Sequence, residues 1–312
     1  MKHRLINRAR RKYGRIVQRL SNANPAGWPL AASSDVAPVF IVGSGRCGTT
    51  LLRRLLIAGG ELQIGPELQG TGRFLQEFNR SARCRWSFVC WMAWFHLSQY
   101  YEWPAFGLAK SEVIRRLKSI EPENRSAAAI LDTIHTMYAS KRGGAGRWGD
   151  KSPNNSEILE LIEPVFPRAQ YIHALRDGVD VVHSMIENDF VESPQDAVQV
   201  WIRRVEAVDR FSEAHPGRVM KVHYEELVSN PWSCMSAVCE FLKLRWDPAW
   251  IDLLDHVSDM GDVPRWSHHA AVAQPVNKAA IGKGRAVLDD AMRRLMQPMN
   301  SLLIRHGYEA VS

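Results

Sequence analysis

From position 38 to position 52 the chain reads PVFIVGSGRCGTTLL. An apolar strand there leads directly into a glycine-rich turn and then into a helix that begins near Thr49. Glycines at 43, 45 and 48 allow backbone N–H groups to converge on an anion, and the N-terminus of the helix adds its dipole. The stretch therefore predicts a phosphate-binding loop; the alternative is a turn that needs glycine only for its backbone angles.

The spacing from Gly43 through Gly48 to Thr50 matches the Walker pattern G-x-x-x-x-G-K-[ST], except that Thr49 replaces the lysine. That lysine reaches the β- and γ-phosphates in nucleoside triphosphatases, so this loop is poorly suited to γ-phosphoryl transfer. Arg46, inside the loop, can direct its guanidinium at a phosphate or sulfate oxygen. We therefore expect a different anionic ligand.

Composition predicts one large globular domain. The chain has 312 residues, 46% of them hydrophobic, and no apolar run approaches the length of a membrane span. Five cysteines, at positions 47, 84, 90, 234 and 239, are odd in number and lack metal-ligand spacing. This pattern favours a reducing, cytoplasmic compartment and no zinc site. Cys47 is expected to fill space in the loop, the alternative being a reactive thiol at a helix N-terminus.

The first 20 residues are strongly basic, with eight lysines or arginines, no acidic residue and apolar residues at helical spacing. Removing those eight from the 40 basic residues leaves 32, against 33 acidic ones. The body of the protein therefore lacks the basic footprint that nucleic-acid binding needs. We expect residues 1–35 to form a basic amphipathic helix and a linker, and residues 36–312 to form the domain. The helix either docks peripherally on an anionic membrane surface or a partner, or packs on its own domain.

Alternating strand and helix patterns follow the loop. Apolar segments run up to Glu67, Lys151, Arg176 and Tyr224, whereas residues 73–140 are helical and rich in aromatic side chains. The pattern predicts an α/β, P-loop-like fold with a central parallel sheet flanked by helices and a helical insertion. Such insertions often form a wall of the substrate site.

Ligands of open α/β sheets bind beyond the carboxyl ends of the strands, so residues at these strand ends should line one crevice. Glu67 is a candidate general base, the alternative being a surface glutamate after a Gly-Pro turn. Lys151 is either a cation at the rim of the anion site or a solvated lysine.

Arg176 stands where a nucleoside triphosphatase would place a magnesium-binding aspartate. Ser184 follows eight residues later, and the two side chains can share one phosphate. Asp177 is expected to cap the next helix rather than to bind a metal. Near the end of the chain, residues 275–285 (PVNKAAIGKGR) form a turn suited to closing over a second phosphate.

These residues resemble the PAPS-dependent sulfotransferases, where PAPS is 3′-phosphoadenosine-5′-phosphosulfate. The likeness covers Pro38–Leu68 and Gly146–Arg285, in a style similar to the tyrosylprotein and bacterial branches. Residues 45–51 (GRCGTTL) resemble the family's 5′-phosphosulfate loop, with Cys47 in place of a serine. Residues 175–184 (LRDGVDVVHS) resemble its 3′-phosphate motif, and residues 222–227 (VHYEEL) its V-x-Y-E-x-L strand end.

The resemblance implies transfer of the sulfuryl group of PAPS to an acceptor hydroxyl of a tyrosine, a carbohydrate or a small molecule. Adenosine 3′,5′-bisphosphate would be released, without a metal. Arg46 and Lys151 would flank the sulfuryl group, and Glu67 would match the catalytic glutamate of tyrosylprotein sulfotransferases; other branches use histidine as the base. The implied cofactor-binding residues are Gly45, Arg46, Cys47, Gly48, Thr49, Thr50, Arg176, Ser184, Tyr224 and Lys283. The family's closing loop usually has an aromatic residue beside the lysine, where this chain has Gly284.

Two other functions fit part of the pattern. A nucleotide kinase would need a cation at position 49 and a metal-binding aspartate at a strand end; the sequence has neither, although Asp177 keeps this alternative open. A catalytically silent nucleotide-binding protein would keep the cofactor residues without turnover.

Overall fold

The structure is a computed structural model that describes residues 24–32, 36–144, 146–254, 257, 260, 262–263 and 272–312. The predicted amphipathic helix at 1–20 lies outside these residues. Of the predicted linker, residues 24–32 are described, and Trp28 packs against Trp86 of the helical insertion with ring centres 5.3 Å apart. Among the described residues, no helix combines the length and apolar content that crossing a membrane requires.

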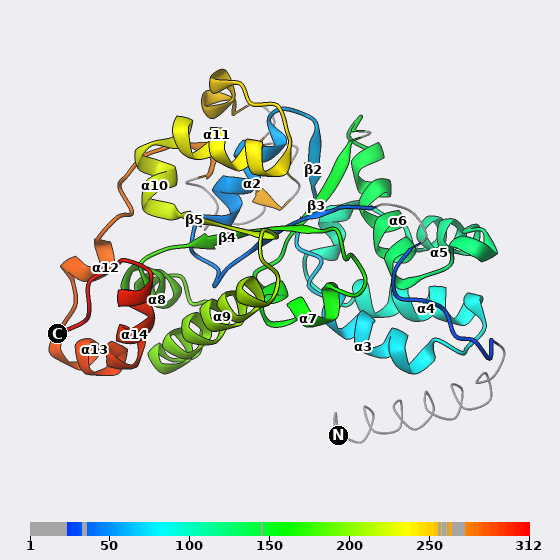
Figure 1. The fold of residues 1–312 in the computed structure, drawn as a ribbon, viewed down its shortest axis with the longest axis horizontal. Coiled ribbons are helices and arrows are strands. Elements are labelled where there is room, and N and C mark those ends of the chain that lie inside the picture. Colours follow the sequence, from blue (N-terminus) through cyan, green and yellow to red (C-terminus); the bar gives the residue numbers. More distant parts are fainter. Residues whose placement is uncertain are drawn as a thin grey trace.

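The centre of the fold is a parallel sheet with the strand order β2-β3-β1-β4-β5 (Figure 1). Central strand β1 pairs with β3 on one side and β4 on the other, and Val39 lies opposite both Gly149 and Gln170. The strands are β1 Val39–Val42, β2 Leu62–Ile64, β3 Arg147–Lys151, β4 Gln170–Leu175 and β5 Val219–His223. The predicted parallel sheet is confirmed.

Both faces of the sheet are buried. Along β1, Phe40 and Val42 belong to one hydrophobic cluster, whereas Val39 and Ile41 belong to a second one. Residues alternate between faces along a strand, so this division shows that apolar side chains cover each face. The apolar runs of the sequence follow from this double burial.

The helices surround the sheet. They are α2 Thr49–Ile57, α3 Thr71–Ser81, α4 Trp86–Leu97, α5 Lys110–Lys118, α6 Ala127–Ser140, α7 Leu159–Ile162, α8 Gly178–Glu187, α9 Pro194–Ala214, α10 Tyr224–Ser229, α11 Pro231–Leu242, α12 Lys283–Ala286, α13 Asp290–Met296 and α14 Asn300–Arg305. Helices α3 to α6 form the predicted insertion and lie together at one end of the molecule, opposite α12 to α14 (Figure 1). The inserted helices therefore form one body beside the sheet.

The strand order places a crevice between β1 and β4. The chain leaves β1 toward β2 on one side of the sheet and leaves β4 toward β5 on the other. Ligands of open α/β sheets bind where the connections diverge in this way. Because the 43–48 loop follows β1 and Arg176 follows β4, both predicted phosphate motifs reach the same crevice.

Candidate active site

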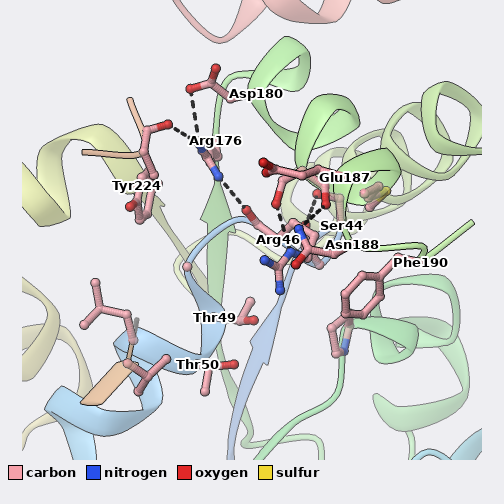
Figure 2. Close-up of a pocket in the computed structure, with 18 of the residues that line it drawn as sticks. Ser44, Arg46, Thr49, Thr50, Arg176, Asp180, Glu187, Asn188, Phe190 and Tyr224 are labelled. Carbon is pink, nitrogen blue, oxygen red and sulfur yellow. Dashed lines mark hydrogen bonds and ion pairs between the residues drawn. The ribbon is translucent and has the colours of Figure 1, made fainter. Parts of the chain in front are cut away.

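A cavity of about 730 Å³ opens beyond the carboxyl ends of β1 and β4 (Figure 2). The predicted site residues that line it are Gly45, Arg46, Gly48, Thr49, Thr50, Glu67, Arg176, Ser184, Tyr224 and Lys283. Two others, Cys47 and Lys151, lie just behind this wall and are each only 1% exposed. The fold thus brings residues from distant parts of the sequence to a single site.

The phosphate loop has little room around its last glycine. Gly48 precedes α2 with φ of 83°, and a Cβ added there would lie 2.6 Å from a ring carbon of Tyr224. Thr49 and Thr50 occupy the first turn of α2, whose N–H groups have no partner within the helix itself. Burial raises the pKa of the Cys47 thiol, which packs in the core as a neutral filler.

Glu67 and Lys151 form an ion pair at the edge of the cavity. The distance from Lys151 Nζ to Glu67 Oε1 is 2.6 Å, and the side chains are 1% and 17% exposed for lysine and glutamate. Strands β2 and β3 are neighbours, so the topology brings their carboxyl ends together. Gln69 Nε2 donates to Glu67 Oε2 and to Tyr101 Oη, both at 3.0 Å. The carboxylate form that pairs with Lys151 is the form that can accept a proton.

Buried Asp150 links the two chain segments that carry Glu67 and Lys151. Its buried carboxylate accepts hydrogen bonds from Ser152 Oγ at 2.7 Å, from Asn155 Nδ2 at 2.9 Å and from the backbone N–H of Leu68. Burial raises the pKa of Asp150, and these hydrogen bonds oppose that rise. Since Leu68 follows Glu67 and Asp150 precedes Lys151, the contact fixes the two strand ends relative to each other.

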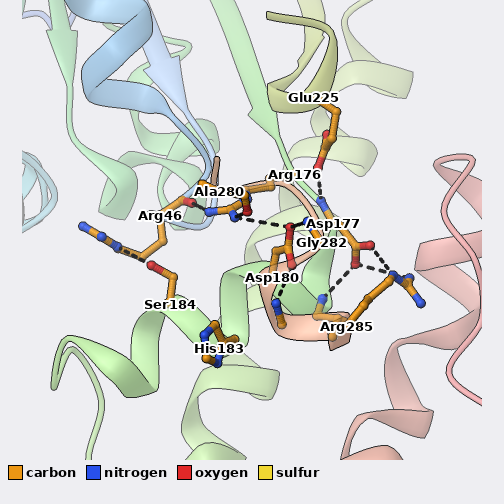
Figure 3. A network of polar contacts seen from close by, with 12 residues as sticks. Arg46, Arg176, Asp177, Asp180, His183, Ser184, Glu225, Ala280, Gly282 and Arg285 are labelled. Carbon is orange, nitrogen blue, oxygen red and sulfur yellow. Dashed lines mark hydrogen bonds and ion pairs between the residues drawn. The ribbon is translucent and has the colours of Figure 1, made fainter. Parts of the chain in front are cut away.

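Arg46 lies with the predicted 3′-phosphate residues. Its Nε donates to Ser184 Oγ at 3.0 Å (Figure 3), and its guanidinium lies 5.0 Å from the ring centre of Phe190 (Figure 2). Burial and the neighbouring Arg176 lower the pKa of Arg46. The two cations predicted to flank one group therefore make different contacts: Arg46 bonds Ser184, and Lys151 bonds Glu67.

Arg176 connects the phosphate loop to the loop at residues 275–285, called the late loop below (Figure 3). Its Nη1 donates to the Arg46 carbonyl at 3.2 Å, while Nη2 donates to Asp180 at 3.3 Å and to the Ala280 carbonyl. The Tyr224 ring centre lies 4.7 Å from the guanidinium. Arg176 Nε is buried without a hydrogen-bond partner among the described residues. An orphaned donor on a residue that lines the cavity fits an anionic ligand.

Asp180 anchors the late loop on α8. Its carboxylate accepts from the backbone N–H groups of Gly282 at 2.7 Å and Gly284 at 2.8 Å. A Cβ at Gly284 would lie 2.6 Å from the Val179 carbonyl oxygen, so an aromatic residue cannot fit there without displacing the loop. The departure from the family pattern has this local reason, and Lys283 still lines the cavity.

As predicted, Asp177 caps α8: its Oδ1 accepts from the Val179 N–H at 2.9 Å. Sequence patterns missed other residues of the site: Gln69, Tyr101, Phe190 and Arg204, which no motif marks, and Asp180, which lies inside the 175–184 motif but has no predicted role. In the described ranges, His, Cys, Asp and Glu side chains do not gather into a group that could hold a metal ion.

Comparisons with known proteins agree with this geometry. A model of the Sulfotransferase family matches residues 38–248. Protein-tyrosine sulfotransferase 1 of Danio rerio is 24% identical, over 98% of this chain and 82% of its own length. Protein-tyrosine sulfotransferase A of Caenorhabditis elegans is 26% identical, over 87% of this chain and 67% of its own.

The fold is also that of a solved structure, the sulfotransferase domain of the Synechococcus PCC 7002 olefin synthase. The TM-score is 0.60 at 22% identity, with 87% of this chain and 98% of that chain covered. The family match and the relatives support sulfuryl transfer over the nucleotide kinase alternative. The chain belongs to the sulfotransferase family and is a PAPS-dependent sulfotransferase.

Proposed function

We propose that this enzyme transfers the sulfuryl group of PAPS to the phenolic hydroxyl of a tyrosine in a peptide or protein. Glu67 is the general base, and Lys151 and Arg46 are the cations on either side of the transferring group. The observation that carries the proposal is the 2.6 Å pairing of Glu67 with Lys151 at the cavity that the phosphate loop also lines. The names of the relatives support tyrosine as the acceptor.

The residues present suit the two ends of PAPS. Backbone N–H groups of the 43–48 loop and the first turn of α2 would hold the 5′-phosphosulfate. Arg176, with its orphaned Nε, and Ser184 would hold the 3′-phosphate, with Tyr224 and Lys283 beside the nucleotide. A sulfuryl group carries less charge than a phosphoryl group, so arginine and lysine can stabilise it without magnesium.

In the reaction, the phenolic oxygen bonds to sulfur while the bond from sulfur to the bridging phosphate oxygen breaks. Glu67 takes the phenolic proton, and the electron pair of the broken bond leaves with adenosine 3′,5′-bisphosphate. Lys151 Nζ would stabilise the charge that develops on the leaving oxygen. Proton removal and charge stabilisation thus come from two residues already in contact.

The surroundings of Glu67 support a phenolic acceptor. The nitrogen of Gln69 that donates to Glu67 Oε2 also donates to the phenol of Tyr101, each at 3.0 Å. The phenol of Tyr101 is therefore linked to the proposed base through a single hydrogen-bond donor, Gln69 Nε2. Tyr101 itself lines the cavity and is 58% exposed.

Three acceptors offered with sulfur-labelled PAPS test the proposal: a tyrosine peptide, the same peptide with phenylalanine, and an oligosaccharide. We expect label on the tyrosine peptide alone, with one adenosine 3′,5′-bisphosphate released per label. Label on the oligosaccharide alone would contradict tyrosine as the acceptor. Binding of the bisphosphate without turnover on any acceptor would favour the catalytically silent alternative.

A further inference from the structure

Four consecutive carbonyl groups of the phosphate loop accept hydrogen bonds from side chains. The donors are Ser156 Oγ to Gly43 at 3.0 Å, Arg204 Nη1 to Ser44 at 3.0 Å, Ser44 Oγ to Gly45 at 3.0 Å and Arg176 Nη1 to Arg46 at 3.2 Å. Except for Ser44, these donors come from outside the loop: from the turn after β3, from α9 and from the end of β4. Side-chain hydrogen bonds thus fix the orientation of every carbonyl from Gly43 to Arg46.

Fixing a carbonyl also fixes the N–H that follows it, because of the geometry of the peptide bond. In a trans peptide the carbonyl and the next N–H point in opposite directions, so a donor that holds a carbonyl outward turns the following N–H inward. An anion needs inward N–H groups, whereas an inward carbonyl would repel it. Gly43 and Gly45 have φ of 151° and 80°, and without a Cβ neither residue resists a flip of its peptide.

The guanidinium of Arg204, which donates to the Ser44 carbonyl, is itself held in place by other contacts. Its Nε donates to Glu157 at 2.8 Å and its Nη2 to Asn154, so the guanidinium is fixed on two further sides. The side chain is 14% exposed, and Ser44 is buried. With Arg204 removed, the Ser44 carbonyl would be buried without this donor and free to turn.

We propose that Arg204 is a positioning residue for the nucleotide: by holding the Ser44 carbonyl, it fixes the conformation of the phosphate loop that receives the 5′-phosphate group. Arg176 acts in the same way on the Arg46 carbonyl, in addition to its proposed contact with the 3′-phosphate. Both arginines belong to other elements, and together they hold the 43–48 loop, which itself lacks the Walker lysine. The inference rests on the proposed function for the identity of the anion.

The test compares Arg204→Met, which keeps the apolar stem, with Arg204→Lys, which keeps the charge and a single point donor. Arg210→Met is the matched control, since Arg210 lies on the same helix with its side chain 70% exposed. Calorimetry with adenosine 3′,5′-bisphosphate measures affinity, and hydrogen exchange of residues 43–48 measures the order of the loop. A thermal melt of each variant monitors the fold.

We expect Arg204→Met to weaken binding at least tenfold, because affinity falls with the fraction of loops in the competent conformation. Loop exchange should quicken without a matching loss of thermal stability, and the Michaelis constant for PAPS should rise more than kcat falls. Arg204→Lys should lie between wild type and Arg204→Met, and Arg210→Met should bind within about twofold of wild type.

Wild-type affinity and unchanged loop exchange in Arg204→Met would overturn the inference. If that variant does not fold, the same two readings on Arg204→Lys decide the question in the same way. Failure of the wild type itself to bind the bisphosphate would instead overturn the proposed function.

Discussion

Replacing Glu67 with glutamine separates proton transfer from nucleotide binding. The amide oxygen can still accept from Lys151 Nζ, now 2.6 Å from Oε1. The new amide nitrogen would face Gln69 Nε2, and a flip of the Gln69 amide would restore that hydrogen bond. The site therefore keeps its shape and loses only the group that accepts a proton. Burying Lys151 beside a neutral partner that still accepts its hydrogen bond should lower the free energy of unfolding by about 1–3 kcal/mol.

Loss of a general base costs roughly 10²–10⁴-fold in rate. We therefore expect Glu67→Gln to lower kcat at saturating acceptor at least about 100-fold, or about 2.7 kcal/mol in the barrier. Affinity for adenosine 3′,5′-bisphosphate should stay within about twofold, because the proposed contact of Glu67 is with the acceptor. Steady-state kinetics with labelled PAPS and calorimetry measure the two quantities.

Glu112→Gln is a matched control, because Glu112 forms a surface ion pair with Lys141 at 3.2 Å, with side chains 36% and 40% exposed. That pair contributes little, so both kcat and affinity should remain at wild-type values. If Glu67→Gln keeps more than about half of the wild-type kcat, Glu67 is not the base. His183, which lines the described cavity, would then be the next candidate.

Three further predictions concern the nucleotide, metals and pH. Arg176→Ala should remove most of the preference for adenosine 3′,5′-bisphosphate over AMP in thermal-shift titrations; equal stabilisation of the wild type by both would contradict the proposed 3′-phosphate contact. Turnover should persist in excess EDTA, and a complete loss that magnesium reverses would return support to a kinase-like mechanism. Burial lowers the pKa of His135 and of His173 to about 3, so below about pH 6.5 the unfolded chain binds protons that the folded chain does not. Stability present above that pH is lost as the pH falls, by about 2 kcal/mol per histidine at pH 5. His135→Phe, which can still stack on Trp148, should reduce this loss by about 2 kcal/mol in urea unfolding compared at pH 7 and pH 5; an equal loss in variant and wild type would refute the assignment.

The loop after β1 and the arginine after β4 were predictable because their signals are local. A buried strand followed by a glycine-rich turn requires only neighbouring residues, and so does an arginine at the end of a later apolar run. The parallel sheet then brings Glu67 and Lys151 together, since Lys151 ends β3 and Glu67 follows three residues after the neighbouring β2. Their direct contact depends on strand order, which the sequence pattern does not contain.

Other features depend on packing between distant segments. Arg53 and Arg54 of α2 are fully buried, although arginine is ordinarily a surface residue. Arg53 pairs with Asp262 at 2.6 Å, and Arg54 donates to the carbonyls of Val272 and Gln274. These partners lie more than 200 residues away, so helical periodicity could not reveal them. The sequence pattern could not predict the proposed role of Arg204 for the same reason, because its partners Ser44, Asn154 and Glu157 belong to other elements.

A structure determined with bound adenosine 3′,5′-bisphosphate would test the proposed site most directly. We expect the 5′-phosphate on the backbone N–H groups of residues 45–50, and the 3′-phosphate within hydrogen-bonding distance of Arg176 and Ser184. Glu67 and Lys151 should lie beyond the 5′-phosphate, where the sulfuryl group would extend. A 3′-phosphate bound beside Glu67, or a nucleotide bound away from the 43–48 loop, would contradict the assignment of the cavity.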